Sequence, residues 1–277
     1  MTDPELLGAR SLRALLAKHG ARPRKELGQN FVVDPNTIRK IVEVAGVTKN
    51  DEVVEIGAGA GSLTLGLAAR ARTVVAIETD AALVAALSEV SQDLPNVKVL
   101  HGDASVMELG AVPARVLVAN LPYNIAATLM LRVLEEAPQI RRGTVMVQRE
   151  VGERLAARPP SRVYGATSVL AAFRADVSIA GRIGRGAFYP VPEVDSVLVS
   201  WARRKVADVD YGAFKQVVKA AFSQRRKTLR NSLASTFGTE AAERALHEVG
   251  IDPGERAERI PVEGYVALTR SLHADLS

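Results

Sequence analysis

Short apolar runs and amphipathic segments alternate through the first half of the chain. Helical spacing of apolar residues is found at 62–70, 81–90 and 125–136. Runs typical of buried strands lie between and around these segments, at 53–56, 73–77, 97–100, 115–119 and 144–148. Strands that alternate with helices at short spacing are typical of a doubly wound parallel sheet, so the pattern predicts an α/β fold.

The pattern differs on either side of this alternation. Residues 1–30 predict a short basic helix and a loop, and we expect this N-terminal arm to be solvated. Asp34 and Pro35 begin a helix that ends at Gly46. Strands predicted at 168–173, 177–183 and 196–201 would complete the sheet with an antiparallel pair. Helices predicted at 211–221, 227–236, 240–249 and 261–272 then form a small all-α domain, residues 206–277, after an α/β domain at 1–205.

Composition excludes several classes of site. The 277 residues include no cysteine, which rules out disulfides, thiolate zinc sites and cysteine nucleophiles. The four histidines are scattered without metal-ligand spacing, so no metal site is predicted. A net charge of +5 is compatible with a nucleic-acid partner. No apolar run is long enough to span a bilayer, and we expect a monomer in the cytoplasm.

The richest chemistry lies where the predicted strand 116–119 ends, in Asn120, Leu121, Pro122 and Tyr123. Pro122 stiffens the turn, which presents a side-chain amide, a backbone carbonyl and an aromatic ring. The amine of a nucleobase is a poor nucleophile because its lone pair is delocalised into the ring. Two acceptors aimed at its N–H groups would localise that lone pair, and an aromatic ring would stack on the base. Alone, the segment is equally compatible with an ordinary β-turn.

The first strand-to-helix turn contains Gly57, Gly59 and Gly61. A dinucleotide fingerprint would have its third glycine one position later, where Ser62 stands. Glu78 and Asp103 follow the next two strands, suited to accept from ribose hydroxyls and from an adenine amino group. A glycine turn with two carboxylates favours S-adenosylmethionine, a cationic cofactor without phosphate, over a nicotinamide dinucleotide.

Five segments together resemble the KsgA-type ribosomal RNA adenine-N6,N6-dimethyltransferases. They are Leu27–Phe31, Glu55–Thr64, Asn120–Ile125, Ala187–Ser196 and Phe222–Asn231. The resemblance implies a Rossmann-like, S-adenosylmethionine-dependent methyltransferase sheet with a small C-terminal helical domain. It also implies an enzyme that dimethylates two adjacent adenines in the 3′-terminal hairpin of small-subunit (16S) ribosomal RNA, with a role in small-subunit biogenesis.

Carried over by position, the resemblance assigns residues to each role. The expected catalytic and adenine contacts are Asn120, Leu121, Tyr123 and Phe188, and the expected cofactor contacts are Asn30, Val32, Gly57, Glu78, Asp103 and Asn120. Pro190 and Pro192 should hold the Phe188 loop extended with its ring exposed. A sister branch that methylates large-subunit RNA in macrolide resistance shares the cofactor half, but segments 27–31 and 224–231 favour the small-subunit branch.

A basic run between Phe214 and Arg230 has no acidic residue and is predicted to be a helix surface that binds RNA phosphates. The predicted RNA contacts are Arg225, Arg226, Lys227 and Arg230, and Arg141, Arg142, Arg149, Arg154 and Arg158 would extend them along one side of the sheet. Two other functions stay open at this point. They are an RNA- or DNA-binding assembly factor without turnover and, less favoured, a nicotinamide dehydrogenase.

Overall fold

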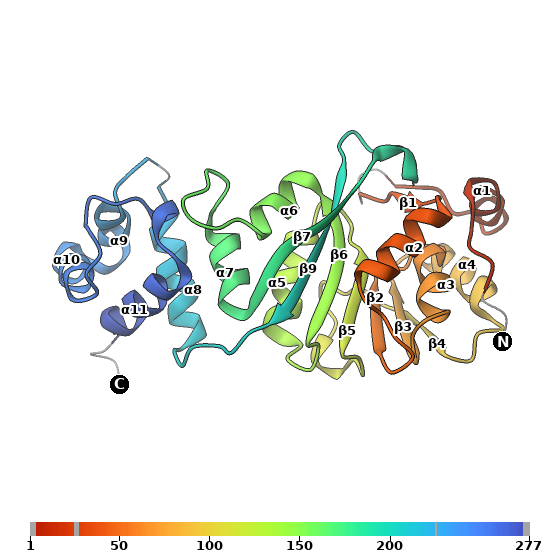
Figure 1. Ribbon diagram of the computed structural model, residues 1–277, viewed down its shortest axis with the longest axis horizontal. Coiled ribbons are helices and arrows are strands. Elements are labelled where there is room, and N and C mark those ends of the chain that lie inside the picture. The colour runs from red at the N-terminus through yellow and green to blue at the C-terminus, as the bar shows by residue number, and fades with distance from the viewer. Residues whose placement is uncertain (1–3, 25–27, 225, 274–277) are drawn as a thin grey trace. The chain divides into compact units, whose positions relative to one another are not determined.

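The computed structural model of the chain describes residues 4–24, 28–224 and 226–273. The chain divides into two compact units, residues 1–152 with 177–203, and residues 153–176 with 204–277. Figure 1 shows the strands of the large sheet in the first unit and helices in the second. This division differs from the domains predicted at 1–205 and 206–277 in one segment, because residues 153–176 group with the C-terminal helices.

The first unit is built on a seven-stranded sheet with the order β4-β3-β2-β5-β6-β9-β7. Neighbouring strands from β4 to β6 pair in parallel, and β9 pairs antiparallel to β6 with Val199 opposite Val145. The predicted Rossmann-like sheet with an antiparallel strand is therefore confirmed. The strands are β2 (Glu52–Ile56), β3 (Thr73–Glu78), β4 (Val97–His101), β5 (Val116–Asn120), β6 (Arg142–Gln148), β7 (Ala175–Ile183) and β9 (Ser196–Arg203).

The order of the strands determines where a ligand can bind. β2 lies between β3 and β5, so the chain moves outward to one side of β2 first and then to the other. Ligands in such sheets bind in the crevice at the carboxyl ends of the strands where this reversal occurs. The turns after β2 and β5 are the two glycine- and proline-containing segments identified in the sequence.

Helices connect these strands as the apolar spacing predicts. They are α2 (Pro35–Val44), α3 (Ser62–Ala68), α4 (Ala81–Ser91), α5 (Ala126–Glu136) and α6 (Arg149–Leu155), of which α6 was not predicted. The Asp34 carboxylate accepts from Asn36 N at 3.1 Å and Thr37 N at 3.0 Å, the N-cap that its sequence predicts. Short 3₁₀ turns occur at Leu109–Ala111, Arg185–Ala187 and Ala257–Arg259.

The N-terminal arm is packed against the first unit, so the expectation of a solvated arm was wrong. Its helix α1 (Ala9–Lys18) buries Leu12, Leu15 and Leu16 in a cluster with Leu83 and other residues of α4. The two-residue strand β1 (Phe31–Val32) then pairs antiparallel with β8 (Phe188–Tyr189). The apolar face of α1 explains the docking, because a solvated helix would leave that face in water.

The second unit consists of α7 (Ala166–Arg174), α8 (Tyr211–Ala221), α9 (Leu229–Phe237), α10 (Thr239–Glu248) and α11 (Val262–His273). The strand predicted at 168–173 was wrong, since this segment lies in α7. Val169 and Phe173, four residues apart, are buried on one helix face, and Gly165 N donates to Ser168 Oγ at the helix start. In the described ranges, none of the helices has both the length and the apolar character needed to cross a bilayer.

Candidate functional site

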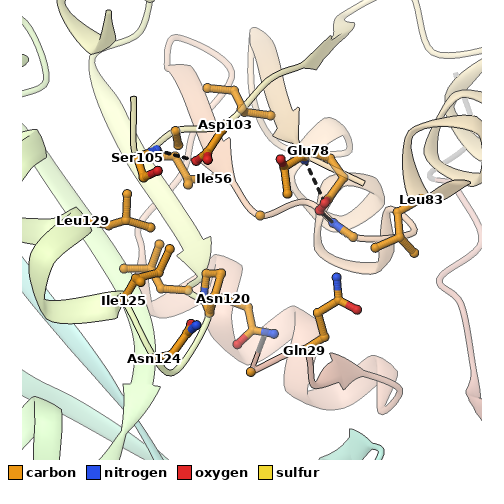
Figure 2. A pocket seen from close by; sticks show the side chains of 18 of the residues that line it. Gln29, Ile56, Glu78, Leu83, Asp103, Ser105, Asn120, Asn124, Ile125 and Leu129 are labelled. Carbon is orange, nitrogen blue, oxygen red and sulfur yellow. Dashed lines mark hydrogen bonds between the residues drawn. The ribbon is translucent and has the colours of Figure 1, made fainter. Parts of the chain in front are cut away.

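A cavity of about 220 Å³ lies at the carboxyl ends of the parallel strands. Three turns line it, residues 28–31, 57–59 and 120–125, together with the ends of β3 and β4. Figure 2 shows Glu78, Asp103, Asn120 and Gln29 arranged around this cavity. Segments far apart in the sequence therefore form one site, as the strand order requires.

Two glycines allow the three turns to approach one another. Gly57 has φ +73°, and a Cβ there would lie 3.4 Å from Pro122 Cδ. Gly28 has φ +65°, and a Cβ there would lie 2.9 Å from Tyr123 N, closer than a carbon atom can approach without a shift. Side chains are disfavoured at both positions by conformation and by space. The glycine turn and the Asn120–Tyr123 turn are thus held close together beside the cavity.

The Glu78 carboxylate is buried at the end of β3 and is already engaged by the backbone. Oε2 accepts from Gly59 N at 2.8 Å, and Oε1 accepts from Thr79 N at 2.8 Å and Asp80 N at 2.9 Å. A carboxylate has about four acceptor positions. These hydrogen bonds leave room for about one more, so Glu78 is better placed to accept from a single ribose hydroxyl than from both.

Asp103 lines the same cavity beyond the end of β4. Its Oδ1 accepts from Ser105 N at 2.7 Å. Hydrogen bonds from Ser105, with a smaller contribution from the charge of Arg132, hold the pKa of the Asp103 carboxyl below its ordinary value. An ionised, exposed carboxylate at this position is a ready acceptor for an amino group.

Asn120 ends β5 with its side chain fixed in one orientation. Its Nδ2 donates to Asn30 O at 2.7 Å, which directs Oδ1 away from that carbonyl. Oδ1 is buried and has no hydrogen-bond partner among the described residues. A buried acceptor without a partner is costly and therefore uncommon in folded proteins. This atom is the strongest indication that a donor belonging to another molecule is bound here.

Next to Asn120, Leu121 supplies a second acceptor and Tyr123 lies behind the turn. Leu121 N donates to Met146 O at 3.1 Å, and its carbonyl receives no hydrogen bond from the part of the chain that is described. Tyr123 is buried, and its hydroxyl lies 2.6 Å from Ser196 Oγ. Burial raises the pKa of the Tyr123 phenol, so this group stays protonated at neutral pH and cannot act as the base.

Two sequence-predicted residues do not line the cavity. Phe188 is only 2% exposed and packs in the apolar cluster that includes Val32 and Leu198. The expectation of an exposed Phe188 ring was therefore wrong, because pairing of β8 with β1 turns the ring into the core. Val32 is also buried in that cluster, although its neighbour Phe31 reaches the cavity.

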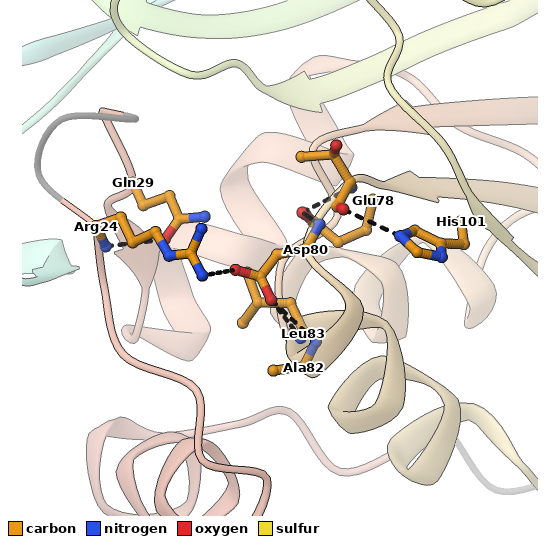
Figure 3. A network of polar contacts seen from close by, with 8 residues as sticks. Arg24, Gln29, Glu78, Asp80, Ala82, Leu83 and His101 are labelled. Carbon is orange, nitrogen blue, oxygen red and sulfur yellow. Dashed lines mark hydrogen bonds and ion pairs between the residues drawn. The ribbon is translucent and has the colours of Figure 1, made fainter.

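Gln29 lines the cavity and was not predicted as a site residue. Its Oε1 accepts from Arg24 N at 2.9 Å, and the Arg24 guanidinium lies 3.5 Å from Asp80 Oδ2 (Figure 3). Asp80 in turn caps α4 by accepting from Ala82 N. The signal for Gln29 was present in the sequence, because it lies directly before Asn30 in a segment of the family resemblance.

A buried carboxyl lies in β2, before the glycine turn. Glu55 is 1% exposed, and Thr64 Oγ1 donates to its Oε2 at 2.6 Å. Burial raises the pKa of Glu55 to about 8, and the charge of Glu78 adds to that shift. Glu55 was not identified from the sequence as a titrating group, since nothing in a strand pattern distinguishes a buried glutamate from a solvated one.

The predicted RNA contacts lie mainly in a turn and not on a helix. Arg226 and Lys227 are exposed between α8 and α9, and Lys227 N donates to Gln224 O. Arg225 lies outside the described residues. Arg230 begins α9 and pairs with Glu243, so the basic run does have a compensating carboxylate in space. The turn, rather than Arg230, carries the uncompensated charge.

The proposed extension of this basic surface along the sheet was partly wrong. Arg142 binds Ala45 O at 2.6 Å and Asp51 Oδ2 at 3.0 Å, so it holds the chain together. It also begins β6, whereas Arg149 follows the end of β6. A seven-residue strand separates the two ends by about 20 Å. These arginines therefore do not form one surface.

Comparison with known proteins agrees with the geometry. Residues 20–274 match the family model "Ribosomal RNA adenine dimethylase". Proteins named ribosomal RNA small subunit methyltransferase A are 47% identical in Streptomyces avermitilis, over 98% of this chain and 95% of the relative. The corresponding protein of Corynebacterium glutamicum is 44% identical over 97% of this chain and 96% of the relative.

Solved structures show the same fold. A dimethyladenosine transferase from Plasmodium falciparum superposes with a TM-score of 0.76 at 22% identity, covering 86% of this chain and 95% of that one. The 23S rRNA methyltransferase ErmE superposes with a TM-score of 0.68 at 27% identity, covering 87% of this chain and 99% of that one. The likeness extends through nearly the whole length of both structures.

Proposed function

The chain belongs to the ribosomal RNA adenine dimethylase family, and from this we propose that it dimethylates N6 of two adjacent adenines in small-subunit (16S) ribosomal RNA. The target is the 3′-terminal hairpin, the methyl donor is S-adenosylmethionine, and the modification belongs to small-subunit biogenesis. The observation that carries the proposal is the buried, unpartnered Oδ1 of Asn120 beside a cavity lined by two carboxylates. We further propose a monomer working in the cytoplasm, since one chain supplies every residue around the cavity.

The cavity suits the cofactor by the chemistry of its residues. Gly57 leaves space beside the turn, Glu78 accepts from a ribose hydroxyl and Asp103 from the adenine amino group. Asn30 and Asn120 complete the expected contacts, with Val32 reached only through its backbone because its side chain is in the core. S-adenosylmethionine would supply an electrophilic methyl group there, and its positive charge matches a site with two carboxylates.

The protein's own part in the reaction is to prepare the target amine. Asn120 Oδ1 and the Leu121 carbonyl accept its two N–H groups, which localises the lone pair on nitrogen and aims it into the cavity. These acceptors are preorganised, because Asn120 Nδ2 is held by Asn30 O and Leu121 N by Met146 O. A strong base is unnecessary, since the methyl group departs from a good leaving group. The amine can release its proton to water after transfer.

Tyr123 and Phe188 remain proposed contacts of the target adenine. Both rings are buried in this structure, and the Tyr123 hydroxyl is held by Ser196. Stacking on a flipped base would require the segment that carries Phe188 to move when RNA binds. This part of the proposal rests on the family resemblance and not on the positions of the rings.

The test is the variant Asn120→Ala. We expect methyl transfer to small ribosomal subunits to fall by about 100-fold or more, because a preorganised acceptor is lost. Cofactor affinity, measured by calorimetric titration, should stay within about tenfold, since losing one neutral hydrogen bond costs on the order of 1 kcal/mol. Near-normal turnover would overturn the mechanism.

Asn96→Ala is a matched control for this test. Asn96 also has a buried, unpartnered Oδ1 and an Nδ2 that donates to backbone carbonyls, but it does not line the cavity. It should lower stability and leave turnover intact. Large ribosomal subunits as substrate would test the second candidate, the 23S activity suggested by the likeness to ErmE. Methylation of large subunits only would replace the proposed function.

A further inference from the structure

The helical unit contains a second cavity, separate from the site at the strand ends. Its volume is about 240 Å³, comparable with about 220 Å³ for the first cavity. Residues at the end of α7, the segment that follows β9 and one face of α11 line it. All of these residues belong to the second unit, so the cavity is complete within it.

The rim of this cavity is cationic. Arg204, Lys205 and Arg270 line it together with a single carboxylate, Glu263. Arg204 Nη2 lies 3.2 Å from Glu263 Oε1, which compensates one of the three cations. Lys205 and Arg270 have no hydrogen-bond or ion-pair partner within the described parts of the chain. Two uncompensated cations at one opening favour an anionic group.

The floor of the cavity is apolar and rigid. Phe173, Val262 and Val266 are each less than 10% exposed and belong to the core of the helical unit. The Phe173 ring stacks on Phe214 with a centroid separation of 4.1 Å and an interplanar angle of 26°. Its position is therefore fixed before any ligand arrives. A bare phosphate would have no use for such a floor, but a nucleotide would, since its base and ribose have apolar surfaces.

We propose that this cavity takes one unpaired nucleotide of the ribosomal RNA, with its phosphate between Lys205 and Arg270 and its base against Phe173, Val262 and Val266. The inference rests on the proposed function, which makes ribosomal RNA the substrate, and it adds a second point of contact remote in sequence from Arg226 and Lys227. Proteins recognise folded RNA largely through unpaired nucleotides whose bases are open to stacking and apolar contact. An acidic peptide of a ribosomal protein is the competing occupant.

Two variants separate a filled cavity from a merely basic surface. Lys205→Ala with Arg270→Ala should weaken binding to small ribosomal subunits by about tenfold and flatten the slope of log affinity against log salt by about one. Ala267→Trp places a bulky ring in the cavity without changing any charge. It should weaken binding by about tenfold, the scale of one lost base contact, and leave the salt slope unchanged. Normal binding by Ala267→Trp would overturn the proposal.

A matched control removes equal charge elsewhere. Lys49 and Arg72 are exposed at the opposite edge of the sheet, before β2 and β3. Lys49→Ala with Arg72→Ala should bind subunits like the unaltered protein. All variants are first compared by thermal unfolding and cofactor titration, so that a misfolded protein is not counted as a binding defect. Loss of binding by the control equal to that of Lys205→Ala with Arg270→Ala would reject a specific site.

The absence of cysteine allows the occupant to be identified directly. Ala267→Cys, labelled with a thiol-specific photocrosslinker, is irradiated on small ribosomal subunits beside Lys49→Cys. We expect an RNA adduct from position 267 only. An adduct with ribosomal protein alone, or none, would overturn the proposal. Methyl transfer by the unaltered protein is measured in the same preparation, so failure of the proposed function would be recognised separately.

Discussion

Single residues around the first cavity combine structural and binding roles. Glu78 shows this most clearly, because its carboxylate orders the glycine turn through Gly59 N and the start of α4 through Thr79 N and Asp80 N. The same carboxylate faces the cavity. A substitution there therefore affects the shape of the turn as well as the contact with a ribose.

The first prediction separates these two roles of Glu78. Glu78→Ala should weaken S-adenosylmethionine binding by roughly 2 kcal/mol, the scale of hydrogen bonds to a charged group. Glu78→Gln keeps an acceptor oxygen and should lose less. Calorimetric cofactor titration and thermal unfolding of both variants give the comparison, and affinity for small subunits should be unchanged in both. If RNA binding collapsed while cofactor binding held, the assignment of this strand end would be wrong.

Glu55 gives a prediction on stability. The folded state raises the pKa of Glu55 from 4.5 to about 8, so between these values the folded protein binds a proton that the unfolded chain has released. The stabilisation is fully present below pH 4.5 and is lost as the pH rises through about 8. The slope from this one group is at most about 1.4 kcal/mol per pH unit.

Glu55→Gln is the test, because it keeps the shape of the side chain and cannot ionise. Between pH 5 and pH 8, the window set by the raised pKa, the stability of the unaltered protein should fall relative to that of the variant. Urea unfolding of both proteins at several pH values measures the difference. Parallel curves would show that Glu55 titrates normally in the folded protein.

At the scale of whole elements, local rules predicted most of the sheet. Strands β2 to β6 and the helices between them follow from apolar period, and Asp34 caps α2 as its position before Pro35 predicts. The six-residue segment 168–173 was misread because a short apolar run has no clear period. Its burial at Val169 and Phe173 becomes meaningful only once the core of the helical unit is known.

Tertiary pairing accounts for the other differences between prediction and structure. The Phe188 ring faces the core because β8 pairs with β1, a contact between segments more than 150 residues apart in the sequence. Arg230 loses its apparent lack of a counterion because α10 brings Glu243 beside it. By contrast, Asn120, Glu78 and Asp103 were predictable as cavity residues, since the ends of parallel strands meet at one edge whatever the packing.

At the scale of the whole molecule, the chain divides chemistry and charge between its two units. The first unit holds the cavity with Asn120, and the second holds the exposed turn with Arg226 and Lys227. A net charge of +5 is modest for an RNA-binding protein of 277 residues. Affinity for RNA should therefore depend on a few local cationic sites rather than on the overall field.

The final prediction concerns that turn. Replacing Arg225, Arg226 and Lys227 together with alanine should weaken binding to small subunits and leave cofactor affinity unchanged. Each lost phosphate contact retains condensed counterions on the RNA, so the slope of log affinity against log salt should flatten by about two to three units. Arg230→Ala is the control, because Arg230 is paired with Glu243 and should affect stability slightly and the slope very little. If the triple variant kept its slope but lost melting temperature, these side chains would be packing groups of the helical unit.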